Sequence, residues 1–255
     1  MSGGEGSTVD EVYFEEAGSG EPVTVLLHSS TADGRMWDSL WPALAARSRV
    51  IRLDFRGYGR TPYASPVPYS DSGDVAALLA RLGLTGVLLV GASYGGQVAL
   101  EVATAHPERA AGLVLLDAGC GLPRTPDLQA FIAEEDRLLE AGDVEAAVRL
   151  NVDTWLGPDA GPQVRERLAG MQRHAFGVQL AADPEPEQVR GRIDLAGIEV
   201  PALVVAGAHD LPYFRECARH MAETMPRARL VELDWAGHLP SMERPAEITD
   251  LIFTL

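Results

Sequence analysis

The segment Gly91–Gly95 reads Gly-Ala-Ser-Tyr-Gly, the residue pattern of a serine nucleophile held at a sharp turn. It directly follows the apolar run Gly86–Val90, which is typical of a buried strand, and it directly precedes a stretch with helical periodicity. A turn this tight requires neighbours without side chains, and glycine meets that requirement on both sides of the serine. We therefore predict a nucleophile elbow with Ser93 at its tip. The alternative is an ordinary glycine-rich turn between a strand and a helix.

A serine hydroxyl attacks a carbonyl group only when a base removes its proton, and histidine is the commonest base. Of the six histidines, His106, His174 and His220 fall in predicted helices, where a packing or solvent-exposed role is the default. His238 follows the last predicted strand, in a loop that can reach the edge of the sheet at which Ser93 lies. His238 is the predicted base.

A histidine base needs a carboxylate to fix its tautomer and to stabilise the imidazolium. Asp210 follows the apolar run Ala202–Ala206 and is the predicted acid. Asp117, at the end of the run Leu113–Leu116, is the alternative acid, and the context of Asp54 suggests that it braces a loop. The chain order Ser, Asp, His differs from the orders seen in other triad proteases.

Attack on a carbonyl produces an oxyanion, which two backbone N–H groups usually stabilise. One should come from Tyr94, directly after the nucleophile, and the other from the loop that begins at His28. We assign the second donor to Ser30, with Ser29 as the alternative. His28 itself is expected to form a hydrogen bond within this loop rather than to act in catalysis.

Apolar runs alternate with amphipathic stretches along most of the chain, which indicates buried parallel strands joined by helices. Helices are expected at 36–46, 71–82, 97–106, 214–225 and from 246 onward, and strands at 23–27, 49–54, 86–90, 113–116, 202–206 and 229–233. The alternation breaks between about 119 and 193, where helical patterns at 128–141, 144–155 and 164–180 end at the apparent hinge Pro184–Pro186. We therefore expect an α/β core formed by residues 1–118 and 194–255, with residues 119–193 inserted as a helical cap.

Along almost its full length the chain resembles the α/β-hydrolase superfamily, in particular the group of 3-oxoadipate enol-lactone hydrolases and small esterases. The resemblance rests on His28–Asp38 (HSSTADGRMWD), on Asp54–Arg60 (DFRGYGR), on the elbow and on Gly237-His238. Many relatives have His-Gly where this chain has His28-Ser29, whereas the enol-lactonases have His-Ser. The resemblance implies a mostly parallel eight-stranded sheet with helices on both faces and a cap between its sixth and seventh strands.

The motifs predict hydrolysis of a carboxylic ester or lactone through an acyl-enzyme, without a metal or an organic cofactor. They are also shared by C–C hydrolases of ring-fission products and by cofactor-free haloperoxidases, so these chemistries stay open, as does a non-catalytic ligand-binding role. For the substrate pocket, Trp37 and Trp155 are the predicted contacts, and Arg35 is a weaker candidate for a substrate carboxylate.

The 255 residues carry a formal net charge of −16, which opposes binding to nucleic-acid phosphates or to anionic lipid. The two cysteines, Cys120 and Cys217, are too few for a disulfide framework and are expected to be free thiols. The Gly/Ser-rich segment Met1–Thr8 lacks a signal-peptide pattern, so we expect a loose tail on a cytoplasmic protein. The expected partner is a small-molecule substrate, and a homodimer is one candidate for the oligomeric state.

Overall fold

The computed structural model describes residues 12–255, so the expected N-terminal tail lies outside the described residues. Within that range the chain forms one seven-stranded sheet in the spatial order β1-β3-β2-β4-β5-β6-β7. The strands are β1 (Phe14–Ala17), β2 (Thr24–Leu27), β3 (Val50–Leu53), β4 (Val87–Ala92), β5 (Ala110–Leu116), β6 (Ala202–Gly207) and β7 (Ala228–Leu233). Only β1 runs antiparallel to its neighbour. The predicted α/β-hydrolase architecture is confirmed, with seven strands in the described residues where eight were expected.

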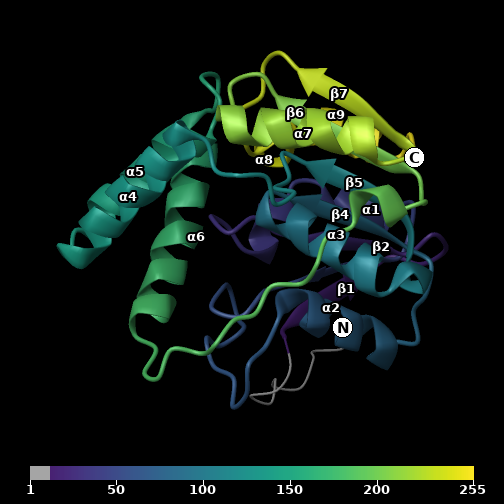
Figure 1. Ribbon diagram of the computed structural model, residues 1–255, viewed down its shortest axis with the longest axis horizontal. Helices are drawn as coiled ribbons and strands as arrows, with labels where there is room; N and C mark the ends of the chain where they lie inside the picture. The colour runs from purple at the N-terminus through teal and green to yellow at the C-terminus, as the bar shows by residue number, and fades with distance from the viewer. Residues whose placement is uncertain (1–11) are drawn as a thin grey trace.

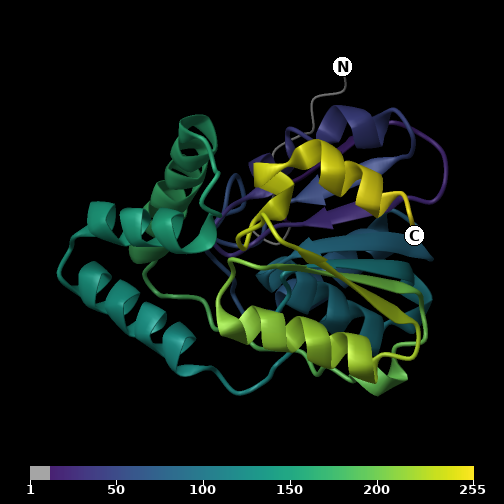
Figure 2. The ribbon, with the colours of Figure 1, turned by 90° about the horizontal axis from the view of Figure 1, so that it is seen from above.

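The helices alternate with the strands as the sequence predicts. They are η1 (Gly34–Trp37), α1 (Trp41–Ala45), α2 (Asp71–Arg81), α3 (Tyr94–Ala105), η2 (Pro107–Arg109), α4 (Pro126–Glu140), α5 (Val144–Trp155), α6 (Pro162–Leu180), η3 (Leu195–Gly197), α7 (Pro212–Thr224), α8 (Pro240–Glu243) and α9 (Pro245–Ile252). Helices α1 and α9 cover one face of the sheet, and α3 and α7 cover the other (Figure 2). Every residue of β4 and β6 is buried, as expected for parallel strands packed on both faces.

Two local predictions differ from the structure, and one strand was not predicted. The helix expected over 36–46 is divided into η1 and α1, because Pro42 has no N–H group and is tolerated only in the first turn of a helix. Helix α3 begins at Tyr94 rather than at 97, because Ser93 takes the capping position directly before it. The edge strand β1 was not predicted, since its four residues include two glutamates and show no apolar run.

The carboxyl ends of the central strands are aligned at one edge of the sheet. Ala92 of β4 pairs with Leu116 of β5, and Leu116 pairs with Val205 of β6. The residues that follow these strands therefore leave the sheet side by side. This register brings the elbow and the two carboxylates that follow β5 and β6 to the same edge.

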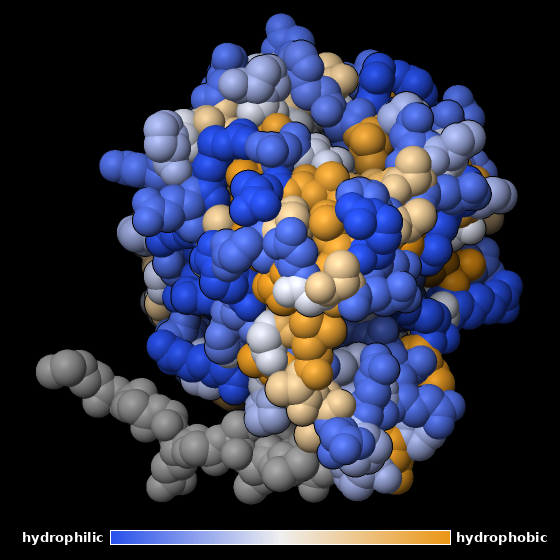
Figure 3. All heavy atoms as spheres, turned by 90° about the vertical axis from the view of Figure 1, so that its left-hand side faces the viewer, coloured by the Kyte–Doolittle hydropathy of each residue, from blue (hydrophilic) through white to orange (hydrophobic). Residues whose placement is uncertain are grey.

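Helices α4, α5 and α6, which we call the cap helices, lie between β5 and β6 in the chain. They stand apart from the sheet, on the side towards which β7 points (Figure 1). Viewed from that side, apolar side chains gather in a strip flanked by polar residues (Figure 3). The division into a core and a cap at residues 118/119 and 193/194 stays a prediction, but the place of these helices agrees with it.

The core consists of one cluster of buried apolar side chains that includes both faces of the sheet. Both cysteines are buried and unpaired, as expected. Between residues 12 and 255, none of the helices is long and apolar enough to cross a bilayer.

A close backbone approach links the end of β6 to the loop that carries His238. A Cβ atom placed on Gly207 would lie 2.0 Å from the carbonyl oxygen of Gly237, whereas a Cβ atom on Gly177 of α6 would meet nothing within 4 Å. We predict that Gly207→Ala lowers the free energy of unfolding by about 1–3 kcal/mol through overpacking. Gly177→Ala should instead raise it by roughly 0.5–1 kcal/mol, because alanine has the higher helix propensity. Thermal unfolding measures both, and equal effects from the two variants would contradict this account.

Candidate active site

Ser93 lies in a strained turn between β4 and α3. Its backbone has φ 52° and ψ −114°, a conformation that residues other than glycine rarely adopt. A Cβ atom on Gly91 would lie 2.4 Å from the Gly95 carbonyl oxygen, and one on Gly95 would lie 2.2 Å from the Leu27 carbonyl oxygen. The glycines are therefore required by close backbone contacts, as the motif predicts. This geometry agrees with the predicted nucleophile elbow.

The hydroxyl of Ser93 makes no capping hydrogen bond to α3, although Ser93 is the residue before that helix. Its backbone is held instead, since its N–H donates to the Leu116 carbonyl at 2.8 Å and its carbonyl accepts from Gly96 at 3.0 Å. The turn is thus fixed by the main chain while the hydroxyl is left available. A nucleophile needs this combination of a rigid position and a side chain without a structural role.

His238 and Asp210 form a buried hydrogen-bonded pair. The His238 Nδ1 atom lies 2.7 Å from Oδ2 of Asp210, and the two residues are 1% and 5% exposed. The other oxygen of Asp210 accepts the Leu211 N–H at 2.6 Å. An ionised Asp210 requires the proton on Nδ1 and leaves Nε2 free to accept one. The structure thus brings the predicted base and the predicted acid together, and Ser93 lies at the same edge of the sheet.

Aromatic rings enclose the His238 imidazole. The ring centroids of Trp155 and Phe214 lie 4.5 and 4.1 Å from it, and its backbone N–H donates to the Trp155 carbonyl at 2.9 Å. This burial lowers the pKa of His238 to about 4, although nearby carboxyl groups act in the opposite direction. The imidazole is therefore neutral, as a general base must be, at any pH well above 4.

Trp155 is itself held by a polar contact within the cap helices. Its indole Nε1–H donates to Oδ1 of Asn151 at 2.9 Å, and the amide of Asn151 donates to Glu135 at 2.5 Å. Residues four positions apart lie on one face of a helix, so Asn151 is placed to orient the indole. Trp155 was predicted as a substrate contact; the structure places it against the predicted base, with 4% of its surface exposed.

The two serines considered for the second oxyanion donor differ in their surroundings. Ser29 is buried, and its N–H donates to the sulfur of Met36 at 3.4 Å. Ser30 is exposed. Because the N–H of Ser29 already has an acceptor, the geometry favours Ser30 as the predicted donor. The N–H of Tyr94 is in the first turn of α3, where N–H groups have no acceptor within the helix.

His28 and Asp54 brace the surrounding loops, as the sequence indicates. His28 Nε2 accepts the Phe55 N–H at 2.9 Å, and its Nδ1 donates to the Ser29 carbonyl at 2.8 Å. Asp54 accepts the N–H groups of Gly34 at 2.7 Å and Arg60 at 2.8 Å. Both ring nitrogens of His28 are therefore occupied by backbone groups, which leaves it no role as a base.

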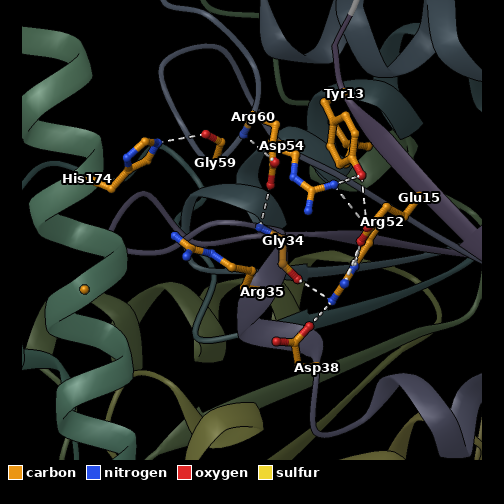
Figure 4. A pocket seen from close by; sticks show the side chains of 12 residues that line it. Tyr13, Glu15, Gly34, Arg35, Asp38, Arg52, Asp54, Gly59, Arg60 and His174 are labelled. Atoms are coloured by element: carbon orange, nitrogen blue, oxygen red, sulfur yellow. Dashed lines mark hydrogen bonds and ion pairs between the residues drawn. The ribbon is translucent and has the colours of Figure 1, made fainter. Parts of the chain in front are cut away.

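A polar cavity of about 590 Å³ lies between α6 and the first strands (Figure 4). Its three guanidinium groups are paired: Arg35 with Asp33, Arg52 with Glu15 and Asp38, and Arg60 with Glu15. Ser93, Asp210 and His238 are not among its lining residues. This cavity therefore gives no support to the hypothesis that Arg35 binds a substrate carboxylate at the nucleophile. Trp37 is completely buried in η1, so its predicted substrate contact also gains no support.

Phe214 and Asn151 were not recognised from the sequence. Phe214 lies on α7, four residues after Asp210, and this short spacing places it over the base. The signal for Asn151 is its spacing of four from a tryptophan on one helix. Either signal is common among residues that only pack, so three-dimensional contacts were needed to identify them.

The lowered pKa of His238 can be measured without any substrate. We predict that its side-chain NMR resonances keep the neutral form on acidification to about pH 5 and titrate near 4, since burial disfavours the imidazolium. A midpoint for His238 at or above the ordinary 6.5 would contradict the buried geometry.

Replacing Asn151 by leucine leaves the buried indole N–H without an acceptor. We expect the free energy of unfolding to fall by about 1–3 kcal/mol, the usual penalty for an unsatisfied buried donor. The same substitution in a Trp155→Phe background should have a smaller effect, because the donor is already absent. Additive effects in this double-mutant cycle would show that the two side chains are not coupled.

Comparison with known proteins agrees with this architecture. Residues 24–251 match the model of the alpha/beta hydrolase family. A protein from Caulobacter sp. (strain K31), assigned by name as a carbamate hydrolase, RutD, is 30% identical over 91% of this chain and 90% of its own. Similar solved structures include the enol-lactonase from Burkholderia xenovorans LB400 (26% identity, TM-score 0.77, 95% of each chain) and a thermophilic esterase from Thermogutta terrifontis (27%, 0.75, 95% of this chain and 92% of that one). The chain belongs to the alpha/beta hydrolase family.

Proposed function

We propose that this protein is a serine hydrolase that cleaves a carboxylic ester or lactone. The observation that supports this most directly is the strained elbow at Ser93, at the same sheet edge as the buried pair of His238 and Asp210. A serine with a free hydroxyl in a strained turn, at the same sheet edge as a neutral histidine that a carboxylate orients, is the arrangement that activates a weak nucleophile.

In the proposed reaction His238 Nε2 takes the hydroxyl proton while Ser93 Oγ attacks the substrate carbonyl carbon. The resulting oxyanion accepts hydrogen bonds from the N–H groups of Tyr94 and Ser30. The tetrahedral intermediate collapses as His238 returns the proton to the leaving alkoxide, which forms the acyl-enzyme. Water then attacks the acyl carbon with the same base, and Ser93 is released with its proton. In a lactone the alkoxide stays attached to the acyl group.

Asp210 would fix the His238 tautomer in every step. Because the pair is almost fully buried, the imidazolium formed during attack depends on the neighbouring carboxylate for compensation. The low pKa of the resting base reflects the same lack of solvent. The aromatic walls from Trp155 and Phe214 favour an apolar group near the leaving alkoxide, which suits an ester or lactone of medium size.

A carbamate is the second candidate substrate, because the relative with 30% identity has a carbamate hydrolase name. Esters, lactones and carbamates all present a carbonyl carbon with a heteroatom leaving group, so the same residues would serve. C–C hydrolysis of a ring-fission product would need activation of a carbon leaving group. Turnover of one p-nitrophenyl ester, one δ-lactone, one aryl carbamate and one ring-fission product would rank these chemistries.

We predict that Ser93→Ala keeps its fold and loses turnover of p-nitrophenyl esters by a factor of about 10⁴ or more, as nucleophile deletion does in other serine hydrolases. Ser39→Ala, the same substitution at an exposed serine, should keep the activity of the unchanged protein. A fluorophosphonate probe should label the protein at Ser93 and fail to label Ser93→Ala. Full ester turnover by Ser93→Ala, or no adduct at Ser93, would overturn the proposal and favour a ligand-binding role.

A further inference from the structure

A second carboxyl group lies beside the predicted acid. Asp117 follows β5, is completely buried, and has φ 48°. Ser93 and Asp117 are the two non-glycine residues with positive φ in the described part of the chain, and they end neighbouring strands. Backbone strain that a fold maintains at two adjacent strand ends points to a function for both residues. The mechanism above uses only the first.

Asp117 is within reach of the catalytic pair. One carboxyl oxygen from each aspartate and one ring nitrogen of His238 all lie within 4.8 Å of one another. Oδ1 of Asp117 accepts the Gly207 N–H at 2.7 Å, while its Oδ2 is buried and has no N–H donor within residues 12–255. Asp210 is the charged group that acts most strongly on the Asp117 carboxyl group.

Two carboxylates in a buried site cannot both ionise, so the pair retains one proton. Asp210 has two further donors, the Leu211 N–H at 2.6 Å and His238 Nδ1 at 2.7 Å, whereas Asp117 has only the Gly207 N–H. The negative charge is therefore better stabilised on Asp210, and the proton belongs on the oxygen of Asp117 that lacks a donor. Burial raises the pKa of both carboxyl groups well above the ordinary value. The two differ in their mutual effect, because the Asp210 charge raises the pKa of Asp117 further whereas the Asp117 carboxyl group lowers that of Asp210, in agreement with this assignment.

We propose that Asp117 is a positioning residue: it remains a neutral carboxylic acid, and its Oδ2–H donates a hydrogen bond to the Asp210 carboxylate. Asp210 then has three donors, from the Leu211 backbone, from Asp117 and from His238, which fix its orientation towards the imidazole. This inference rests on the proposed function for its catalytic meaning. The charge state that it assigns to Asp117 is independent of that function.

Other charged groups that face the pair must be taken into account in any pH measurement. They are Arg215 on α7 and Glu243 on α8, in addition to His238 itself. Arg215 and Glu243 are present in every variant at Asp117. A change in the titration of His238 between variants at Asp117 therefore reports the charge of Asp117.

The test compares Asp117→Asn, Asp117→Ala and the unchanged protein. Asparagine is neutral, has nearly the same shape and can still donate, so the His238 titration by NMR should shift by less than about 0.5 pH unit. If Asp117 were ionised, the same substitution would remove a negative charge beside the imidazole. The His238 midpoint would then fall by about one unit or more, which would overturn the proposal. Asp127→Asn, at an exposed position on α4, controls for the change in net charge.

Kinetics test the positioning role. Asp117→Ala removes the donor, and we expect its kcat for a p-nitrophenyl ester to fall at least about tenfold below that of Asp117→Asn, with little change in KM. Equal kcat values for the two variants would overturn that role. An active Asp210→Asn together with an inactive Asp117→Asn would also overturn it, because Asp117 would then be the acid itself.

If Asp117→Ala does not fold, the isosteric variant Asp117→Asn and the titration of His238 still decide the charge state of Asp117. If the unchanged protein cleaves no ester, the proposed function fails, and the titration still tests this assignment.

Discussion

The hydrogen bond between His238 and Asp210 is buried on every side, and this burial constrains the rest of the site. An imidazolium or a carboxylate in such surroundings is stable only when its charge and its lone pairs are matched by nearby groups. The Leu211 N–H supplies one such partner to Asp210, and the hydrogen bond that we propose from Asp117 supplies another, while the rings of Trp155 and Phe214 exclude water. The same exclusion of water keeps the base neutral, which is the state that can accept a proton.

Placing these groups together requires main chains to approach more closely than side chains would allow. The end of β6 contacts the loop before His238 at Gly207 and Gly237, and the elbow contacts the end of β2 at Gly95. Gly207 thus lets the end of β6 lie against the loop of His238, and Gly95 lets the first turn of α3 lie against the end of β2. The strained φ angles at Ser93 and Asp117 are the other consequence of this crowding, because residues with side chains must turn sharply where the strands end.

The cap helices contribute to the site through one aromatic residue. Trp155 packs against the imidazole, and its backbone carbonyl accepts the His238 N–H, so the base is held by α5 as well as by its own loop. Asn151 fixes the indole from within the same helix. The position of the base therefore depends on the packing of a segment that lies between β5 and β6 in the chain. A change in the cap sequence can alter the base without touching the sheet.

The residues around Ser93 and the alternation of apolar runs with amphipathic stretches were enough to predict the α/β core, the inserted helices and the three candidate catalytic residues. These features are local: a strand, a turn and a helix are encoded within about 20 neighbouring residues, and the carboxyl ends of parallel strands must share an edge. The division of residues 36–46 into two helices follows from Pro42 and could also have been predicted. The edge strand β1 could not, because its sequence has no distinguishing pattern.

Only the tertiary structure decided how the competing residues are arranged around the candidate site. Asp117 and Asp210 both follow strands, and the sequence favoured Asp210 as the acid with Asp117 as the alternative. In the structure Asp210 is hydrogen-bonded to the imidazole, and a carboxyl oxygen of Asp117 lies within 4.8 Å of both groups. Likewise Trp155 packs on the base and Trp37 lies in the core, although either could have lined a pocket. Burial, charge compensation and hydrogen-bond partners depend on residues far apart in the chain, so a linear pattern does not specify them.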